Sequence, residues 1–361
     1  TARRRCVGVI VAGALVLAGC GDNLEARDDH DGGWVTGCGG ATGNGGEGGS
    51  GGGGVLPANA FTVIALPDTQ YYSLSYPDIF NAQVDWILDQ RTERRIPFVL
   101  HEGDVVNDDF PIQWERASRA LHKLDGIVPY VLAQGNHDYF TMGGILDRAS
   151  MVNQYFPVVA LAAAPGFLGS FEPDRVENTA RLLMMGDTPW LVISLEFGPR
   201  AAALQWADGI LKAHSSTPAM VVTHAYLYWD GTRYDHVAHP FDQEFSPYHY
   251  AASPPPGSVS DGEEMWKKVI EANENVQFVI SGHVFKYPPG DAAASLTSTH
   301  PSGRKVHQIV ANYQETALGG AGYLRLMQFC PGEGEVRVST YSPYLDSWKR
   351  DPANQFTLPL P

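Results

Sequence analysis

The sequence has little positive charge, few cysteines and no long apolar run beyond its first 20 residues. Lysine and arginine total 25 against 40 aspartates and glutamates, which gives a formal net charge of −15. Because a negatively charged protein surface repels the phosphate backbones of nucleic acids, this charge argues against nucleic-acid binding. Outside the first 20 residues, no segment is long and apolar enough to cross a membrane.

Residues 1–20 are predicted to be a lipoprotein signal peptide. Three arginines at 3–5 precede the apolar run 7–18, and the segment ends in Leu-Ala-Gly-Cys20. This order of charge, apolar run and small residues is typical of a secretory signal. The ending resembles the bacterial lipobox, whose cysteine is acylated and becomes the mature N-terminus. We therefore expect export, with lipid on Cys20 holding the protein at a bacterial membrane, in the periplasm or at the cell surface. An ordinary signal peptide is the alternative.

The four cysteines do not define a disulfide framework. Cys6 lies in the predicted signal peptide and Cys20 is the predicted lipid site, so Cys38 and Cys330 remain. An exported protein can form disulfides. No spacing pattern supports a bond between these two cysteines, and their pairing stays open.

Residues 21–57 are predicted to be a disordered tether because glycine dominates the segment. Such a segment buries too little apolar area to offset the entropy of ordering it. A phosphate-binding loop would need a strand before these glycines and a helix after them, and the sequence predicts neither. Residues 58–361 show no internal repeat and are predicted to form one catalytic domain.

The ordered part alternates between buried strands and helices. Strands are predicted at 61–66, 96–101 and 128–133, and helices at 78–95 and 114–124 separate them. This alternation predicts a largely parallel sheet with helices on its faces.

The second half continues the alternation after an irregular segment, 140–187, which we expect to cover part of the site. A loop at 225–260 is the other long connection. Further strands are predicted at 190–195, 219–223 and 276–280, helices at 200–213 and 263–272, and strands of a second sheet at 306–311, 324–329 and 336–340.

A polar cluster follows each of five predicted strands. Ligands bind at this edge of open α/β sheets because the loops converge there. Asp, Asn and His side chains suit borderline divalent metals such as Zn, Mn or Fe. The clusters are Asp68-Thr-Gln70, Gly103-Asp104, Gly135-Asn136-His137-Asp138, Thr223-His224 and Gly282-His283.

In this order the motifs resemble those of the calcineurin-like metallophosphoesterases, which include purple acid phosphatases and phosphodiesterases. The family pattern is D-x-H, G-D-x-x, G-N-H-[DE], a lone His after a strand, and G-H-x-H. The resemblance covers roughly residues 61–340. It implies an α/β fold in which two facing mixed β-sheets are flanked by helices.

The resemblance also implies a pair of divalent metal ions. Asp104 would bridge them, and Asn136, His224 and His283 would complete the second metal position. Asp68 and Gln70 would bind the first. A hydroxide activated by the metals would attack phosphorus, since metals lower the pKa of bound water and neutralise phosphate charge.

Two further residues carry catalytic roles by the same resemblance. His137 would stabilise the transition state or protonate the leaving oxygen, and Asp138 would orient His137.

The chain departs from the family pattern twice, and both departures fall on the first metal position. Gln70 stands where the family has a His, and Phe285 stands where it has the second His of G-H-x-H. Gln can still ligate through its amide oxygen, whereas Phe cannot. Three outcomes are open: a hard metal such as Mg, Mn or Ca, one tightly bound metal only, or replacement of the ligand by His101, His307 or Glu315.

The predicted function is hydrolysis of a phosphomonoester or phosphodiester outside the cytoplasm. Arg233 and Asn178 are predicted to contact the phosphate of a small phosphorylated substrate, since an Arg fork suits phosphate. A non-catalytic binding protein and a nucleotide or pyrophosphate hydrolase are the alternatives. The sequence leaves substrate, metal identity and oligomeric state open.

Overall fold

The computed structural model describes residues 56, 59–140, 142–286 and 288–361. The predicted signal peptide, 1–20, and nearly all of the predicted tether, 21–57, lie outside the described residues, as does Cys38. Within the described ranges, none of the helices has both the length and the apolar character needed to cross a membrane.

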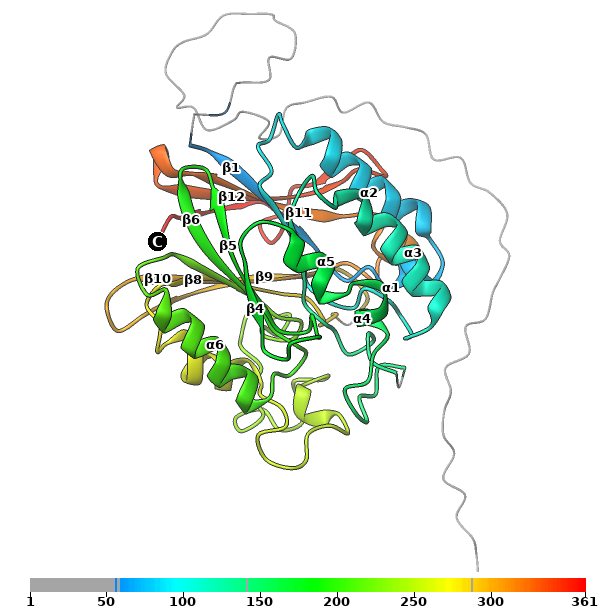
Figure 1. Ribbon diagram of the computed structural model, residues 1–361, viewed down its shortest axis with the longest axis vertical. Coiled ribbons are helices and arrows are strands. Elements are labelled where there is room, and N and C mark those ends of the chain that lie inside the picture. The colour runs from blue at the N-terminus through cyan, green and yellow to red at the C-terminus, as the bar shows by residue number, and fades with distance from the viewer. Residues whose placement is uncertain (1–55, 57–58, 141, 287) are drawn as a thin grey trace, which may run out of the picture. The chain divides into compact units, whose positions relative to one another are not determined.

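Two mixed sheets form the centre of the described domain (Figure 1). The first runs in the order β13 (Ser347–Lys349), β12 (Glu335–Ser342), β11 (Leu324–Cys330), β1 (Phe61–Leu66), β2 (Phe98–His101) and β3 (Tyr130–Leu132), with β14 (Phe356–Pro359) beside β12. The second runs in the order β4 (Phe167–Ser170), β5 (Thr179–Met185), β6 (Thr188–Ser194), β7 (Ala219–Val222), β8 (Val276–Ser281), β10 (Lys305–Asn312) and β9 (Ala292–Thr299).

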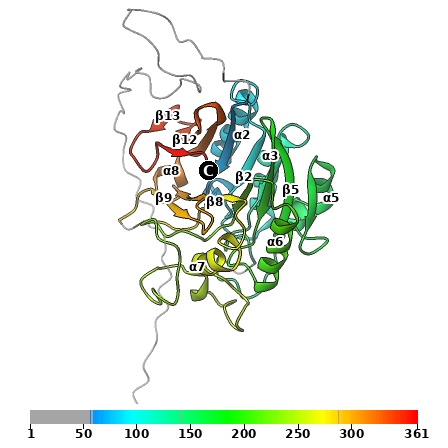
Figure 2. The same cartoon turned by 90° about the vertical axis from the view of Figure 1, so that its left-hand side faces the viewer.

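Helices cover the outer faces of this two-sheet stack. In Figure 1, α2 (Pro77–Gln90) and α3 (Pro111–Leu121) lie on one side and α6 (Ala201–Ala213) lies on the opposite side. Figure 2 places α7 (Gly262–Met265) near α6, away from α2. The remaining α-helices are α1 (Gln70–Leu74), α4 (Val152–Tyr155), α5 (Val158–Ala163) and α8 (Ala317–Gly320), with 3-10 turns at His122–Leu124, Pro247–His249 and Pro331–Glu333. The predicted fold is confirmed.

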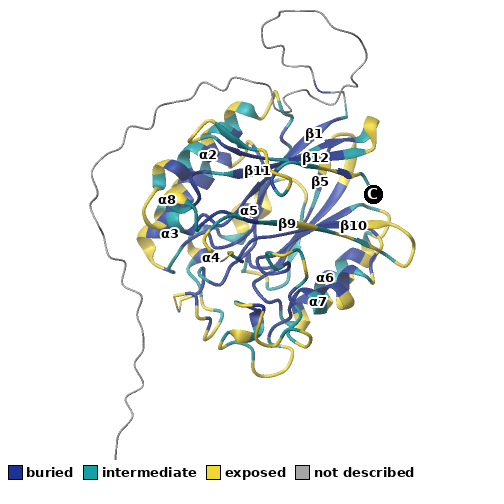
Figure 3. Ribbon diagram, turned by 180° about the vertical axis from the view of Figure 1, so that it is seen from behind, coloured by how far each residue is buried: buried dark blue, intermediate teal, exposed yellow. Residues whose placement is uncertain are grey.

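The alternation of side chains along β1 explains why a core forms on both faces of the first sheet. Phe61, Val63 and Ala65 pack between the two sheets, whereas Ile64 and Leu66 pack against the helices. Successive side chains of a strand point to opposite faces, so a strand that is covered on both sides must be apolar throughout. The burial view agrees: the strands are buried and exposed residues concentrate on helices and loops (Figure 3).

The prediction that the last three strands belong to the second sheet is wrong for two of them. β10 lies in the second sheet, parallel to β8, but β11 pairs antiparallel with β1 and β12 pairs with β11 in the first sheet. The pairing begins at Phe61 opposite Phe329. An apolar pattern indicates that a strand is buried but does not indicate which strand it pairs with. The sequence therefore could not assign these strands to one sheet or the other.

The segment 140–187 is more regular than predicted. It contains α4, α5, β4 and β5, and β5 joins the second sheet beside β6. Arg181 interrupts the apolar pattern of β5, yet it is buried and donates to the carbonyl oxygen of Leu161. The predicted helix 263–272 is likewise split, because α7 continues as a π-helical turn, Trp266–Ile270.

Candidate metal centre

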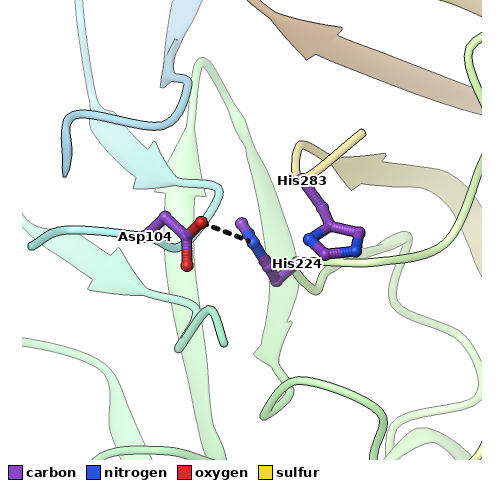
Figure 4. A group of neighbouring side chains, drawn as sticks. All are labelled: Asp104, His224 and His283. Atoms are coloured by element: carbon purple, nitrogen blue, oxygen red, sulfur yellow. Dashed lines mark ion pairs between the residues drawn. The ribbon is translucent and has the colours of Figure 1, made fainter. Parts of the chain in front are cut away.

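The loops that follow the parallel strands bring three potential ligands together. Asp104 follows β2, His224 follows β7 and His283 follows β8. All three are buried, and one ligand atom of each lies within 4.8 Å of the others. In Figure 4, His224 lies between Asp104 and His283. The predicted convergence of these strand-end loops is therefore present.

Asp104 is held in an uncommon backbone conformation. Its φ is +49°, and Gly103 before it has a φ of +104°. One carboxylate oxygen of Asp104 accepts a hydrogen bond from the backbone N–H of His137 at 2.9 Å. The other lies 3.2 Å from Nε2 of His224. Burial alone would raise the pKa of Asp104, but the imidazoles of His224 and His137 hold it below its usual value.

His224 is oriented by the chain just before Asp104. Its Nδ1 donates to the carbonyl oxygen of Glu102 at 2.8 Å, so in the neutral ring Nε2 carries the lone pair. Nε2 is buried and has no hydrogen-bond partner. Burial by itself would lower the pKa of His224, but the charges of Asp104 and Asp68 outweigh this effect and raise the pKa to about 9. A cation at Nε2, either a proton or a metal ion, relieves the contact between this lone pair and the Asp104 carboxylate.

His283 presents its other ring nitrogen to the same point. Its Nε2 donates to the carbonyl oxygen of Phe245 at 2.8 Å, which leaves the lone pair on Nδ1. Burial and the neighbouring His224 lower the pKa of His283 to about 3, so the ring is neutral. The φ of His283 is +74°. Backbone strain of this kind concentrates at sites where a side chain must be aimed.

Asn136 supplies a fourth donor. Its Nδ2 donates to the carbonyl oxygen of Gly143 at 3.3 Å, and its buried Oδ1 has no partner. Buried polar atoms without a partner are uncommon in folded proteins. Asp104, His224 and His283 present their ligand atoms within 4.8 Å of one another, and the unpartnered oxygen of Asn136 belongs to the same cavity lining as Asp104 and His283. Together these are donors that a divalent cation prefers. The described residues fit one such ion.

Two glycines make room for this arrangement. A Cβ on Gly103 would lie 2.5 Å from Nδ1 of His224. A Cβ on Gly135 would collide with the carboxylate of Asp104. The glycines of the Gly-Asp and Gly-Asn-His-Asp motifs thus allow the ligand loops to approach each other.

The residues predicted for the first metal position are tied into a network of amides. Asp68 accepts from Nδ2 of Asn312 at 2.9 Å and from the backbone N–H of His283 at 3.2 Å. Nε2 of Gln70 donates to Oε1 of Gln314 at 2.9 Å, which also accepts from Asn312. Burial raises the pKa of Asp68 to about 7. The buried Oε1 of Gln70 has no partner, so this position offers oxygen donors in place of imidazoles.

Sequence reasoning missed Asn312 and Gln314. They stand at and just after the end of β10, which runs parallel to β8. The signal that could have identified them is the pair of polar residues directly after the predicted strand 306–311.

None of the three candidate replacements for the missing imidazole occupies the site. His101 uses both ring nitrogens, with Thr69 and with the N–H of Gly103. His307 bonds to Thr297 and to the carbonyl of Pro359. Glu315 is not among the described residues that line the cavity at the site.

His137 has the position expected of a catalytic side chain, but Asp138 does not orient it. His137 donates from Nδ1 to the carbonyl oxygen of Asn107 at 2.8 Å, and it lines the cavity. Asp138 is fully buried and accepts from the backbone N–H groups of Val106 and Gly135. These bonds hold two ligand loops together, and the predicted catalytic role of Asp138 stays a prediction. Burial raises the pKa of Asp138 well above its usual value.

Arg233 and Asn178, which are predicted to contact substrate, are not among the described residues that line the cavity, and both side chains are engaged with other protein groups. Arg233 pairs with Glu263 at 2.6 Å and covers the ring of Trp266. Asn178 is buried and accepts from the backbone N–H of Glu196 at 3.0 Å. Both side chains are used in holding the second sheet and its loops, a role that sequence position cannot distinguish from phosphate binding.

The chain is similar to known proteins over the region that contains the site. The family model described as calcineurin-like phosphoesterase matches residues 61–287. A relative, the uncharacterized protein YvnB of Bacillus subtilis strain 168, is 32% identical over 287 residues, which are 79% of this chain and 20% of the relative. The chain therefore spans about a fifth of the length of that relative.

Two solved structures resemble the chain at 12% identity. One is GAP50, the anchor in the inner membrane complex of Plasmodium, with 83% of this chain and 88% of that chain covered and a TM-score of 0.42. The other is a protein serine/threonine phosphatase from Saccharomyces cerevisiae, with 83% of each chain covered and a TM-score of 0.31. The family match includes all the candidate ligands from Asp68 to His283.

Proposed function

This chain belongs to the calcineurin-like phosphoesterase family, and on that premise we propose that it hydrolyses a phosphate ester at the Asp104–His283 site. The observation that carries the proposal is the cluster of Asp104, His224 and His283, whose ligand atoms lie within 4.8 Å of one another. Nε2 of His224 and Oδ1 of Asn136 are buried without a partner, and Asn136 lines the same cavity as Asp104. A divalent ion there supplies two things, a lowered pKa for water and compensation of phosphate charge.

The protein's own groups account for the rest of the proposed reaction. Asp104, Asn136, His224 and His283 hold the ion, and each is fixed by a backbone contact that aims its donor atom. His137 lines the cavity, and its Nε2 holds a proton or passes it to the leaving oxygen. The substrate is a phosphorylated small molecule or ester that enters the cavity beside His137.

We propose two metal positions of unequal strength. The position at Asp104, Asn136, His224 and His283 binds tightly. The position at Asp68 and Gln70 binds weakly, because an amide replaces one imidazole and the ring of Phe285, which has no donor atom, replaces the other. Asn312 also competes for the Asp68 carboxylate. Oxygen donors favour a hard ion such as Mg, Mn or Ca at the weak position, and the His and Asn donors favour Zn, Mn or Fe at the tight one.

Metal analysis tests this proposal directly. Purified full-length protein, passed through a desalting column, is expected to retain about one transition-metal ion per chain and to hydrolyse a chromogenic phosphate ester. A strong chelator is expected to remove both the ion and the activity, and added metal to restore them. Gln70→Ala is the matched variant and should keep the tight ion, because Gln70 contributes only to the weak position.

Three results would contradict it. Hydrolysis that persists after complete removal of metal contradicts the proposed metal-dependent mechanism. Tight metal without hydrolysis of any phosphate ester identifies a binding protein. Two ions held equally tightly contradict the inequality of the positions.

We also propose that the protein is exported and anchored by lipid on Cys20, a proposal supported by the Leu-Ala-Gly-Cys ending of the signal-like segment. Metabolic labelling with a palmitate analogue in a bacterial host is expected to mark the protein and to find it with membranes. Cys20→Ser should lose both the label and the membrane fraction, whereas Cys38→Ser should keep them. An unlabelled wild-type chain excludes the anchor.

A further inference from the structure

The cavity beside the metal centre has an apolar wall. It has a volume of about 700 Å³, and Asp104, Asn136 and His137 contribute to its lining. Phe245 and Phe285 form part of its wall, with ring centroids 4.7 Å apart. Phe285 thus fills with an aromatic ring the place where the family pattern has an imidazole.

The cavity mouth carries apolar side chains as well. Met142 is 70% exposed and Phe241 is 89% exposed, and both line the same cavity. Large apolar side chains at such exposure are the expected lining where an apolar part of a ligand is received.

The charge of the lining is negative apart from its histidines. Among the described residues that line the cavity there is no lysine or arginine, while Asp104 and Glu244 are acidic. The basic groups of the lining are the imidazoles of His137, His249 and His283. A substrate phosphate therefore meets no guanidinium or ammonium group in this lining.

The arginines in the neighbouring loops are engaged elsewhere. Arg148 donates to the carbonyl oxygens of Phe197, Gly198 and Ser258. Arg200 is paired with Glu196. Both are held by several bonds at once, so moving either one into the cavity would break those bonds.

The number of negative charges on the substrate decides how it meets this lining, because the described residues of the lining include no lysine or arginine. A phosphodiester is a monoanion, whereas a phosphomonoester at pH 8 is a dianion because its second pKa is about 6.

Resting on the proposed function, we infer that the site selects phosphodiesters over phosphomonoesters and receives an aromatic or apolar ester group on the wall formed by Phe245 and Phe285. A diester brings one negative charge to a lining whose described residues include no lysine or arginine, and its second ester group takes the place of the second charge of a monoester. Glu244 opposes a dianion in the same cavity.

Three substrates with one leaving group test the inference at pH 8: bis(p-nitrophenyl) phosphate, methyl p-nitrophenyl phosphate and p-nitrophenyl phosphate. We expect kcat/KM to fall in that order, with about a tenfold or greater gap between the better diester and the monoester, since one uncompensated charge in a partly buried site costs more than 1.4 kcal/mol. A monoester hydrolysed faster than both diesters overturns the inference and leaves the proposed function intact. Failure of all three substrates in metal-loaded protein overturns both.

Aromatic-wall variants test where the second ester group lies. Phe285→Ala and Phe245→Ala are expected to lower the ratio of bis(p-nitrophenyl) to methyl p-nitrophenyl activity by about twofold to tenfold, the usual contribution of an aromatic contact. Because both substrates are measured on the same preparation, this ratio does not depend on the folded fraction. Tyr344→Ala is the matched control, since Tyr344 is 47% exposed and outside the lining.

Glu244→Gln gives an independent readout of charge. Removing this carboxylate is expected to raise monoester activity relative to diester activity by about twofold, a small effect because Glu244 is exposed and its charge is screened by solvent. An unchanged substrate ratio in Phe245→Ala and Phe285→Ala would show that the wall does not contact the ester group.

Discussion

Asp104→Asn is expected to lower phosphate-ester hydrolysis by about a thousandfold and to remove the tightly held metal ion, because a metal supplies several kcal/mol of transition-state stabilisation. The substitution changes volume little, and the amide oxygen can still accept from the N–H of His137. The new amide group, however, takes the place of the oxygen 3.2 Å from Nε2 of His224. This amide donates a hydrogen bond to that nitrogen. Because the substitution also removes the negative charge that attracts a cation, the site no longer binds the metal ion.

The matched control is another buried aspartate that accepts backbone and side-chain hydrogen bonds. Asp109 binds the indole N–H of Trp114 and the N–H of Met151, so Asp109→Asn should retain metal and activity. Metal content is read by elemental analysis and activity by a chromogenic ester. Full activity and a full metal complement in Asp104→Asn would remove Asp104 from the centre.

His137→Ala is expected to reduce kcat by about two to four decades while the tight ion stays bound, since proton transfer by a positioned side chain contributes that much. The reason is its geometry: Nδ1 is fixed by the carbonyl of Asn107, and the ring lines the cavity. His137 reaches Asp104 through its backbone N–H, which alanine retains.

The leaving group separates the two roles open to His137. If the ring protonates the leaving oxygen, the loss is larger for an alkyl or phenyl ester than for a p-nitrophenyl ester, which leaves without a proton. An equal loss for all esters indicates charge stabilisation.

Arg233→Ala is the control, and we expect activity within about twofold of wild type but a lower unfolding temperature, since the pair with Glu263 is partly buried. Wild-type kcat in His137→Ala would remove the residue from the reaction.

The strand ends and the donors that follow them could be predicted from sequence because both are local features. A run such as 61–66 is apolar at every position except Thr62, and a strand of that kind must be covered on both faces. Gly103-Asp104 and Gly135-Asn136-His137-Asp138 follow such runs directly, and parallel strands end at one edge of their sheet. The fold class, Asp104, Asn136, His224 and His283 followed from these features and from the resemblance to a known family.

The roles of neighbouring polar residues could not be predicted in the same way. Asp138 stands beside His137 in the sequence, but its carboxylate faces the N–H groups of Val106 and Gly135. Arg233 lies in a loop after His224, but Glu263 and Trp266 hold it elsewhere. Two residues that are adjacent in a loop can point in opposite directions, and only packing decides which.

The sequence by itself determined that buried strands end in Asp, Asn and His side chains with glycines beside them. The tertiary structure decided which lone pairs converge, that Asn312 and Gln314 surround Asp68, and that β11 joins the first sheet. The physical reason is chain separation: the bond between Asp68 and the N–H of His283 joins residues 215 positions apart, and that between Asp68 and Asn312 joins residues 244 positions apart. Contacts of this range exist only once the two sheets have packed.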